Sequence, residues 1–362
     1  MKIAIAAVIT KKIEPHPLGG TEMFTYLLVE GLIKKGHDVT LYCAKGSQTS
    51  AHQIEICEPN EAMGQESNVE FVYPYTLLEM RQILEDLKTQ KFDLIHINFL
   101  KTFVASYFAE EINIPVVQTI HRDFMESPRL YKVYQRMGFH QNEHFVFVSK
   151  KAQDRSLLKQ NTHAIHNGIN ISDFPFNREE NQNTYLWLSR IDELKGPKEA
   201  VLAAQKAGVK LILSGDIDRK KYQDYFDSEI KPLLSDSIVH EKPSTVERKI
   251  ELYQKAKAFL FPIQWEEPFG LVVAEAMSCG TPVIAFNRGA MSEIIQDGVT
   301  GYLVDQGNGV EGIVEAINRL NPLSREEYAK MRQNARKRIE DNFSVARMVE
   351  NYENLYKELI KQ

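Results

Sequence analysis

Two glutamates that stand eight residues apart, Glu267 and Glu275, form the pattern in this sequence that most clearly indicates chemistry. They belong to the stretch WEEPFGLVVAEAMSCGTPVI, which starts at Trp265. We expect Phe269 and Gly270 to turn the chain from a strand into a helix that carries Glu275 about two turns in. Phosphate binds well at a helix N-terminus, where backbone N–H groups have no intrahelical partner. The stretch therefore predicts a phosphate site between two carboxylates, although a generic strand–helix unit with solvated glutamates has the same pattern.

An arginine and a lysine five residues apart form a second candidate group. Arg190 and Lys195 lie in SRIDELKG, residues 189–196, between the apolar run Tyr185–Leu188 and a helical stretch. At the carboxyl end of a strand they can converge on a diphosphate, where arginine holds two oxygens and lysine acts as a point charge. Solvated cations are common in loops, so the pair indicates a diphosphate site mainly in combination with the glutamates.

In the N-terminal half, Gly19 and Gly20 lie between an expected strand, Lys2–Val8, and a helix that begins at Thr21. Two glycines allow a ligand to approach the backbone closely, and the helix N-terminus favours an anion. The segment is not the G-x-G-x-x-G fingerprint, so a nicotinamide-dependent dehydrogenase loses its main support. The alternative is a flexible loop in which Thr21 caps the helix.

Two histidines are expected at the carboxyl ends of strands, where ligands of open α/β sheets bind. His121 follows Val116–Ile120, and His96 lies within Leu94–Asn98. We favour a functional role for His121, whereas His96 is equally compatible with a structural role.

Two patterns that could suggest a metal site are set aside. Asp216 and Asp218 have the D-x-D form that holds a metal in the single-domain GT-A glycosyltransferases, but a turn needs such residues in any case. His140 and His144 lack a third ligand and are expected to be solvated. The sequence thus predicts neither a metal nor a cofactor.

Short apolar runs alternate with helical segments almost throughout, as in parallel α/β domains. The aperiodic span 169–183 indicates a connection between two halves. A final helical segment, about Ser344–Lys361, carries an apolar stripe that needs a surface to cover. The further expected strands are Val39–Cys43, Val69–Tyr73, Phe145–Val148, Val209–Leu213, Ser237–His240, Ala258–Phe261 and Val283–Ala285.

Composition narrows the class of protein further. The chain has 362 residues, 43% hydrophobic and 26% charged, and a formal charge of −5, which gives no electrostatic reason to expect nucleic acid as a partner. Three cysteines without a C-x-x-C pair favour a reducing cytoplasm over a disulfide framework. No run approaches the length of a membrane span. A peripheral membrane contact stays open, with Arg129–Gly138 as a candidate segment.

Taken together, the glutamate stretch, with Gly280-Thr281-Pro282 behind it, resembles the E-x7-E signature of family 4 of the retaining GT-B glycosyltransferases. SRIDELKG, Asn167-Gly168 and Thr300–Val304 also match the family, and the resemblance is strongest from Tyr185 to Val304. It implies an α/β GT-B fold, in which two Rossmann-like parallel-sheet domains face a cleft and the C-terminal helix crosses back to the N-domain. The expected domains are an acceptor side, 1–166 with 345–362, and a nucleotide-sugar-binding side, 167–344.

The resemblance also implies roles for individual residues. Arg190, Lys195 and the amides near Gly270 would stabilise the leaving diphosphate, while Glu275 would accept from the ribose and Glu267 from the sugar. His121 would orient the sugar. The implied donor-binding residues are Gly19, Gly20, Arg190, Lys195, Glu267, Phe269, Gly270, Leu271 and Glu275. The implied catalytic residues are His121, Glu267, Arg190 and Lys195.

The expected donor is a nucleotide sugar, with a UDP-sugar favoured on family frequency, and the acceptor is a glycan, a lipid-linked or a small-molecule hydroxyl. The family's usual small residues before the first glutamate are replaced by Pro262–Trp265, which leaves the identity of the donor sugar open. Two alternatives remain: a phosphate-dependent phosphorylase of the same family, and a non-catalytic module that binds nucleotide sugar. Sugar-nucleotide epimerases share the architecture but lack this pairing of the glutamate stretch with Arg190 and Lys195.

Overall fold

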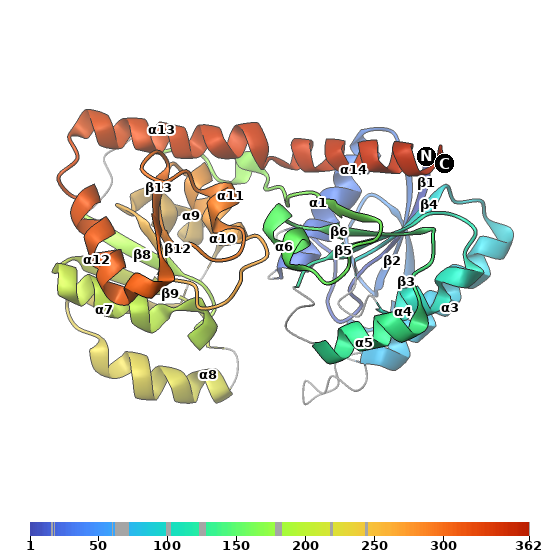
Figure 1. Cartoon of the computed structure of the whole chain (residues 1–362), viewed down its shortest axis with the longest axis horizontal. Helices are drawn as coiled ribbons and strands as arrows, with labels where there is room; N and C mark the ends of the chain where they lie inside the picture. The colour runs from blue at the N-terminus through green and yellow to red at the C-terminus, as the bar shows by residue number, and fades with distance from the viewer. Residues whose placement is uncertain are drawn as a thin grey trace. The chain divides into compact units, whose positions relative to one another are not determined.

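The computed structural model describes residues 1–15, 17, 19–59, 61, 72–98, 103–122, 128–177, 183–217, 220–242 and 245–361. Its tertiary contacts divide the chain into two units (Figure 1). Unit 1 comprises Met1–Gly168 with Val345–Gln362, and unit 2 comprises Ile169–Ser344.

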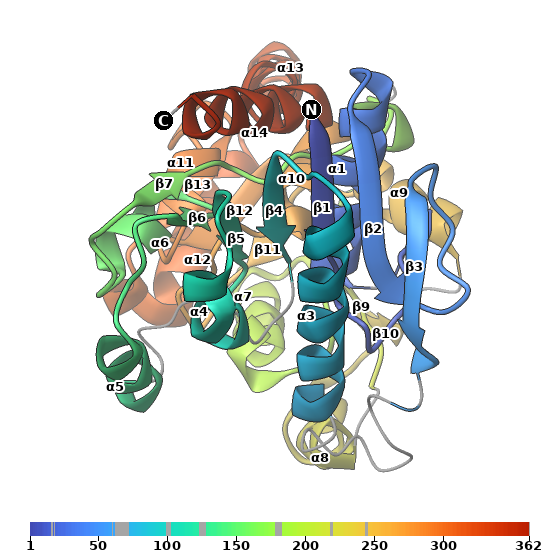
Figure 2. The same ribbon diagram turned by 90° about the vertical axis from the view of Figure 1, so that its right-hand side faces the viewer.

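Unit 1 is built on a parallel sheet with the strand order β3-β2-β1-β4-β5-β6-β7, seen face-on in Figure 2. The order reverses between β1 and β4, so the crevice in which open α/β sheets bind ligands lies at the carboxyl ends of these two strands. The strands are β1 (Lys2–Ala6), β2 (Asp38–Ala44), β3 (His52–Cys57), β4 (Leu94–Ile97), β5 (Val116–Ile120), β6 (Glu143–Phe147) and β7 (Thr162–Ala164).

Helices cover both faces of the unit 1 sheet because side chains alternate along each strand. In β1, Ile3 and Ile5 point to α1 (Gly20–Lys34) and α14 (Val345–Leu359), whereas Ala4 and Ala6 point to the opposite face, against α3 (Val72–Thr89) and α4 (Phe103–Phe108). The described part of unit 1 also contains the α-helices α5 (Pro128–Met137) and α6 (Lys150–Arg155).

The C-terminal helix α14 belongs to the core of unit 1, which confirms the expected crossing of the chain back to its N-terminal half. It lies so close to α1 that a Cβ atom on Gly31 would come within 2.4 Å of Val349 Cγ2. Glu353 of α14 is buried and forms ion pairs with Lys35 and Lys357 at 2.7 Å each. The predicted apolar stripe is buried at Val349, Tyr352, Leu355, Tyr356 and Leu359.

Unit 2 contains a second parallel sheet, with the order β10-β9-β8-β11-β12-β13 and a reversal between β8 and β11. The polar loops that follow these two central strands therefore meet at one edge of the sheet. The strands are β8 (Thr184–Leu188), β9 (Lys210–Ser214), β10 (Ile238–Glu241), β11 (Phe259–Phe261), β12 (Val283–Phe286) and β13 (Gly301–Val304).

In unit 2, helices α7 (Pro197–Ala207) and α12 (Gly309–Leu320) pack on one face of the sheet. On the other face, α10 (Leu271–Ser278) lies between the sheet and α13 (Arg325–Asn342), with α9 (Val246–Lys255) beside it. Among the described residues, unit 2 also contains the short α-helices α8 (Lys220–Tyr225) and α11 (Met291–Ile294).

Some local predictions were wrong. Val72 and Tyr73 were expected in a strand but begin α3, and residues 69–71 lie outside the described ranges. An aromatic, β-branched run favours a strand, yet Thr76, Glu79, Met80 and Ile83 recur at helical spacing and are buried. Proline at position 74 is tolerated because it lies in the first turn. The strands β3, β7 and β13 were not predicted.

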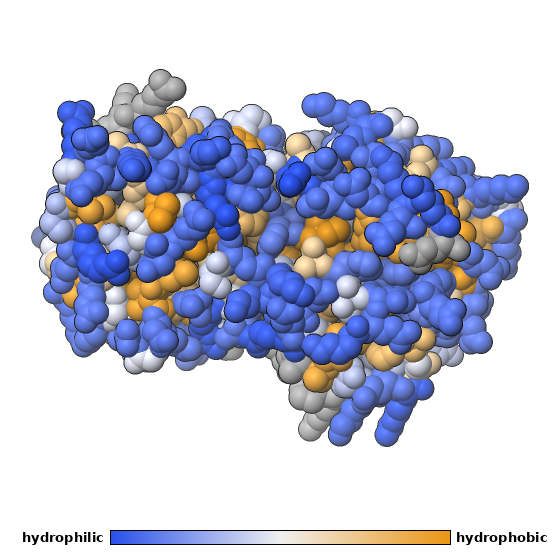
Figure 3. All heavy atoms as spheres, turned by 45° about the horizontal axis from the view of Figure 1, so that its top comes forward, coloured by the Kyte–Doolittle hydropathy of each residue, from blue (hydrophilic) through white to orange (hydrophobic). Residues whose placement is uncertain are grey.

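Within the described ranges, no helix combines the length and the apolar character needed to cross a membrane. Hydrophilic residues predominate on the face of the molecule shown in Figure 3.

Candidate functional site

The loops that follow β8 and β11 are joined to each other at the carboxyl edge of the unit 2 sheet. The Gln264 N–H donates to the carbonyl of Leu194 at 2.9 Å. Gly196 has a φ of 69°, and a Cβ at this position would lie 2.0 Å from the carbonyl oxygen of Pro262. Glycine is therefore required here both for the left-handed backbone and for the close approach of the two loops.

Lys195 and Glu267, one from each loop, form an ion pair at this edge. Lys195 Nζ lies 2.7 Å from Glu267 Oε2, and both side chains are largely shielded from solvent. The Trp265 indole N–H donates to the same oxygen at 3.1 Å, and Lys195 Nζ lies 4.9 Å from the centre of the Trp265 ring. The structure thus brings two predicted site residues together and adds a tryptophan to them.

Arg190 lies in the same loop as Lys195 but has partners of its own. Its guanidinium donates to Asp192 Oδ2 at 2.9 Å and lies over the ring of Tyr222, 5.0 Å from the ring centre. Burial alone would raise the pKa of Asp192, but hydrogen bonds from Arg190 and the Leu194 N–H outweigh it and lower that pKa. Arg190 is more exposed than Lys195 and sits at the outer side of the loop.

The segment from Phe269 to Leu271 begins helix α10 as predicted. Gly270 precedes the helix with φ 93° and ψ 67°, a backbone conformation that residues with a side chain rarely adopt. Phe269 is buried against Phe343, with ring centres 5.8 Å apart. Among the described residues, the N–H groups of Leu271 and Val272 have no acceptor, so this helix end can receive an anion.

Glu275 is buried in the second turn of α10, about one turn from the start of the helix. The prediction that it lies about two turns in was wrong. Its Oε2 atom forms an ion pair with Lys249 at 2.6 Å and accepts a hydrogen bond from the Tyr253 hydroxyl at 3.0 Å. Both partners come from α9, and the contacts leave Oε1 without a partner among the described residues. This oxygen is the one that can accept from a ligand.

A third loop, which follows β12, contacts Glu266 and the backbone of Glu267. Glu266 pairs with Arg288 at 3.2 Å and accepts from the Gly289 N–H at 2.7 Å, while the Ala290 N–H donates to the Glu267 carbonyl at 2.9 Å. A Cβ on Gly289 would lie 2.1 Å from that carbonyl oxygen. The backbone on both sides of Glu267 is therefore fixed.

Several residues of this cluster were not themselves predicted as site residues, among them Trp265, Lys249, Tyr253 and Arg288. Trp265 was noticed only as a departure from the family pattern. Lys249 and Tyr253 share one helix face at i and i+4 spacing, a signal that is common in any helix.

In unit 1, the predicted residues Gly19 and Gly20 lie at the start of α1. Gly19, not Thr21, occupies the N-cap position, and no side chain caps the helix. Leu18, which precedes them, lies outside the described residues. The loop before α1 follows β1, so it lies at the reversal point of the sheet.

The two strand-end histidines have different surroundings. Both ring nitrogens of His96 are bonded inside the core, one to the Tyr356 hydroxyl and the other to Thr119 Oγ1 at 2.7 Å, which gives this histidine a structural role. His121 packs edge-on against Phe24, with ring centres 4.8 Å apart, and its buried Nε2 atom has no partner among the described residues. Burial lowers the pKa of His121 to about 3, so its imidazole is neutral at pH 7.

The residues set aside as metal ligands have ordinary surroundings. Asp216 pairs with Lys242 at 3.0 Å, and Asp218 lies outside the described residues. The expectation that His144 is solvated was wrong, because it is buried with its ring 5.7 Å from that of His163. No cluster of three potential metal ligands occurs in the part of the chain that the structure describes.

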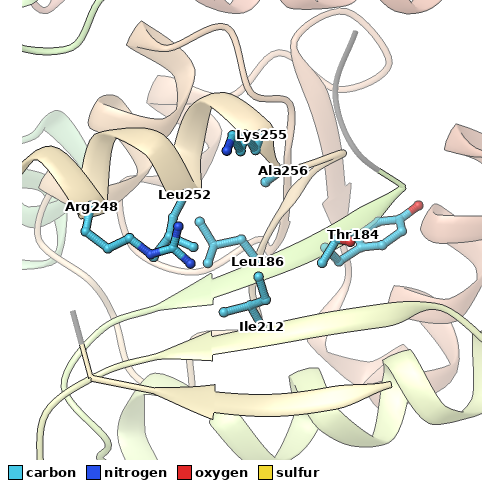
Figure 4. A pocket seen from close by; sticks show the side chains of 8 residues that line it. Thr184, Leu186, Ile212, Arg248, Leu252, Lys255 and Ala256 are labelled. Carbon is cyan, nitrogen blue, oxygen red and sulfur yellow. The ribbon is translucent and has the colours of Figure 1, made fainter. Parts of the chain in front are cut away.

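A pocket lies on another part of unit 2, between α9 and the strands β8 and β9 (Figure 4). Arg248 at its rim already donates to both oxygens of Glu241, at 3.1 and 2.8 Å, and to Glu251 at 2.7 Å. The pocket is lined by Thr184, Tyr185, Leu186, Ile212, Arg248, Leu252, Lys255 and Ala256, and not by the predicted residues.

Solved structures similar to this chain place it in the GT-B fold class. Sucrose-phosphate synthase from Thermosynechococcus elongatus has a TM-score of 0.79 with 19% identity, over 100% of both chains. A glycosyltransferase from Rickettsia africae has a TM-score of 0.78 with 21% identity, over 100% of this chain and 99% of that one. Anabaena HepE, solved in complex with UDP and glucose, has a TM-score of 0.76 with 20% identity, over 99% of this chain and 100% of that one.

Models of protein families agree with this fold class and identify a family within it. The model described as glycosyl transferases group 1 matches residues 169–338, and that of Glycosyltransferase Family 4 matches residues 18–173. The chain belongs to the family 4 glycosyltransferases.

Curated relatives are somewhat more similar in sequence than these solved structures. The putative glycosyltransferase YtcC of Bacillus subtilis is 24% identical over 77% of this chain and 75% of its own length. The N-acetyl-alpha-D-glucosaminyl L-malate synthase of Bacillus anthracis is 24% identical over 80% of each.

Proposed function

We propose that this chain is a retaining glycosyltransferase that moves a sugar from a nucleoside-diphosphate sugar to a hydroxyl group of a glycan, a lipid-linked or a small-molecule acceptor. One observation carries the proposal. At the reversal point of the unit 2 sheet, Lys195 and the N-terminus of α10 offer positive charge beside two glutamates, each of which has one oxygen without a partner in the described part of the chain. A UDP-sugar is the favoured donor, a choice supported by the UDP-bound structures of Anabaena HepE.

In the proposed complex, the donor's diphosphate binds Lys195, Arg190 and the first N–H groups of α10. Oε1 of Glu275 accepts from the ribose hydroxyls and Oε1 of Glu267 from the sugar hydroxyls. As the bond from the sugar to the diphosphate breaks, negative charge grows on the diphosphate, and preorganised donors stabilise it. This arrangement supplies the charge stabilisation from the chain's own residues.

Retention requires attack from the face that the diphosphate leaves, or two successive inversions. The carboxylate charge of Glu267 is already paired, since Lys195 and the Trp265 N–H both hold its Oε2 atom. This supports front-face attack assisted by the leaving phosphate over a covalent intermediate. Detection of a glycosyl adduct on Glu267 by mass spectrometry would count against it.

His121 is proposed to orient the donor sugar. A neutral imidazole with an unpartnered Nε2 can accept from or donate to a sugar hydroxyl without introducing charge. It is therefore a positioning group and not an acid or base that titrates near neutral pH.

The proposal predicts that a nucleoside diphosphate raises the melting temperature of the protein and that UDP raises it most. Selective binding to the folded state stabilises it by about 2.7 kcal/mol when the nucleotide is present at a hundred times its dissociation constant. The measurement compares UDP, GDP, ADP and TDP on the wild type and on Glu275→Gln, which keeps the side-chain volume but removes the charge.

Glu251→Gln is the matched control, because Glu251 is a carboxylate of α9 that pairs with Arg248 and Lys255 at the surface of the helix. The shift should be lost in Glu275→Gln and kept in Glu251→Gln. No shift with any of the four nucleotides in the wild type would contradict the proposal.

A further inference from the structure

Both tryptophans of this chain donate their indole N–H to the Lys195–Glu267 pair. Trp187, fully buried in β8, donates to the backbone carbonyl of Lys195 at 3.0 Å. Trp265 donates to the side chain of Glu267 at 3.1 Å. One tryptophan therefore fixes the backbone of the lysine, and the other fixes the carboxylate of the glutamate.

Trp265 contacts both members of the pair at once. Its N–H occupies the same Oε2 atom of Glu267 that Lys195 occupies, and its ring face lies 4.9 Å from Lys195 Nζ. An ammonium group at this distance from an indole face is attracted by the ring's quadrupole. The tryptophan thus holds the lysine and the glutamate together from one side.

The loop that carries Trp265 is itself rigid. Gln264 bonds to Leu194 through its backbone and to the Pro262 carbonyl through its side chain at 2.8 Å, and Arg288 donates to the Gln264 carbonyl. A side chain on such a loop can hold a neighbouring group in one orientation at little entropic cost.

We propose that Trp265 is a positioning residue that determines how the sugar part of the donor is held, and not how its nucleotide part is held. By occupying Oε2 of Glu267 and restraining Lys195, it leaves Oε1 of Glu267 as the sole oxygen directed at the ligand. The inference rests on the proposed function, and it assigns a role to a residue at which this chain departs from the family pattern.

Physical separation of the two glutamates supports this division. Glu267 is held by Trp265 and Lys195, whereas Glu275 is held by Lys249 and Tyr253 of α9. No residue is shared between the two sets of contacts. Loss of the indole N–H therefore loosens the group assigned to the sugar and leaves the group assigned to the ribose in place.

The test replaces Trp265 by Phe, which keeps an aromatic face beside Lys195 and removes the N–H. The readouts are the dissociation constants of UDP and UDP-glucose, kcat/KM of transfer from UDP-glucose, and the melting temperature. We expect kcat/KM and UDP-glucose affinity to fall roughly tenfold to a hundredfold, as for a lost hydrogen bond to a charged group. UDP affinity should change less than twofold.

Trp187→Phe is the comparison variant, since it also loses an indole N–H, but one that is directed at the backbone carbonyl of Lys195 and not at the carboxylate of Glu267. It should lower the melting temperature and leave the ratio of UDP-glucose to UDP affinity at the wild-type value. A Trp265→Phe protein that loses UDP and UDP-glucose affinity in parallel, together with stability, would show a merely structural role and overturn the inference.

Two further outcomes separate this inference from the proposed function. If the wild type transfers sugar and Trp265→Phe equals it in every readout, only the inference fails. If the wild type binds no nucleotide, the proposed function fails and the inference with it. A crystal structure of Trp265→Phe adds a readout that needs no donor: Glu267 should turn away from its present orientation, and an unchanged Lys195–Glu267 contact would overturn the inference.

Discussion

Replacement of Lys195 by Ala is expected to lower kcat of sugar transfer by about 10²–10³-fold, while the protein stays folded. Lys195 lies at the reversal point of the unit 2 sheet and is more shielded from solvent than Arg190, and in the proposed complex it faces the oxygens on which charge develops. Removal of one preorganised charge-stabilising donor costs about 2.7–4 kcal/mol of activation free energy in comparable sites. Steady-state kinetics with the donor selected by the melting experiment measure the effect.

The control for this variant is Lys198→Ala, three residues along the chain. Lys198 forms an exposed ion pair with Glu229, a type of contact that contributes little to stability. Its replacement should change kcat less than twofold. Equal loss of activity in both variants, or full activity of Lys195→Ala, would show that Lys195 does not stabilise the diphosphate during transfer.

The second large effect is expected from removal of helix α14. A chain that ends after Ser344 should fail to fold unit 1, because α14 supplies six buried side chains to the core around β1 and α1. Loss of one buried Leu, Ile or Met side chain typically costs about 2–5 kcal/mol, and a whole domain is stable by only about 5–15 kcal/mol. The six side chains are Met348, Val349, Tyr352, Leu355, Tyr356 and Leu359.

Truncation also breaks a polar network that holds the strands β4 and β5 to the helix. His96 and Thr119 lose the hydroxyls of Tyr356 and Tyr352, so buried polar groups are left without partners. Calorimetry and limited proteolysis should show one remaining folded unit, 169–344. Leu355→Ala serves as a milder control that should lower stability without unfolding. A truncated protein that melts like the full chain would contradict this account of unit 1.

Much of the site in unit 2 could be predicted because its information is local. A strand followed by a glycine-led helix specifies where Gly270 and Glu275 lie, whatever surrounds them. Likewise, the loop 189–196 follows directly from the end of β8 and the start of α7. Local order of strand, loop and helix also determines the parallel sheets.

The remaining features depend on contacts between distant segments. His96 and His121 have the same pattern in the sequence, but Tyr356, 260 positions away from His96, decides that His96 is structural. Lys249 and Tyr253 become partners of Glu275 only because α9 lies against α10. Val72 and Tyr73 lie in a helix and not in the expected strand because the burial of α3 against the sheet outweighed the strand preference of aromatic and β-branched residues.

The most direct test of the central claim is a crystal structure of the protein with the diphosphate nucleotide that raises its melting temperature most. The account predicts the diphosphate within hydrogen-bond distance of Lys195 Nζ and the Leu271 N–H, with the ribose hydroxyls on Glu275 Oε1. A nucleotide bound elsewhere, such as in the pocket beneath α9, would contradict the assignment of the donor site to the carboxyl edge of the unit 2 sheet.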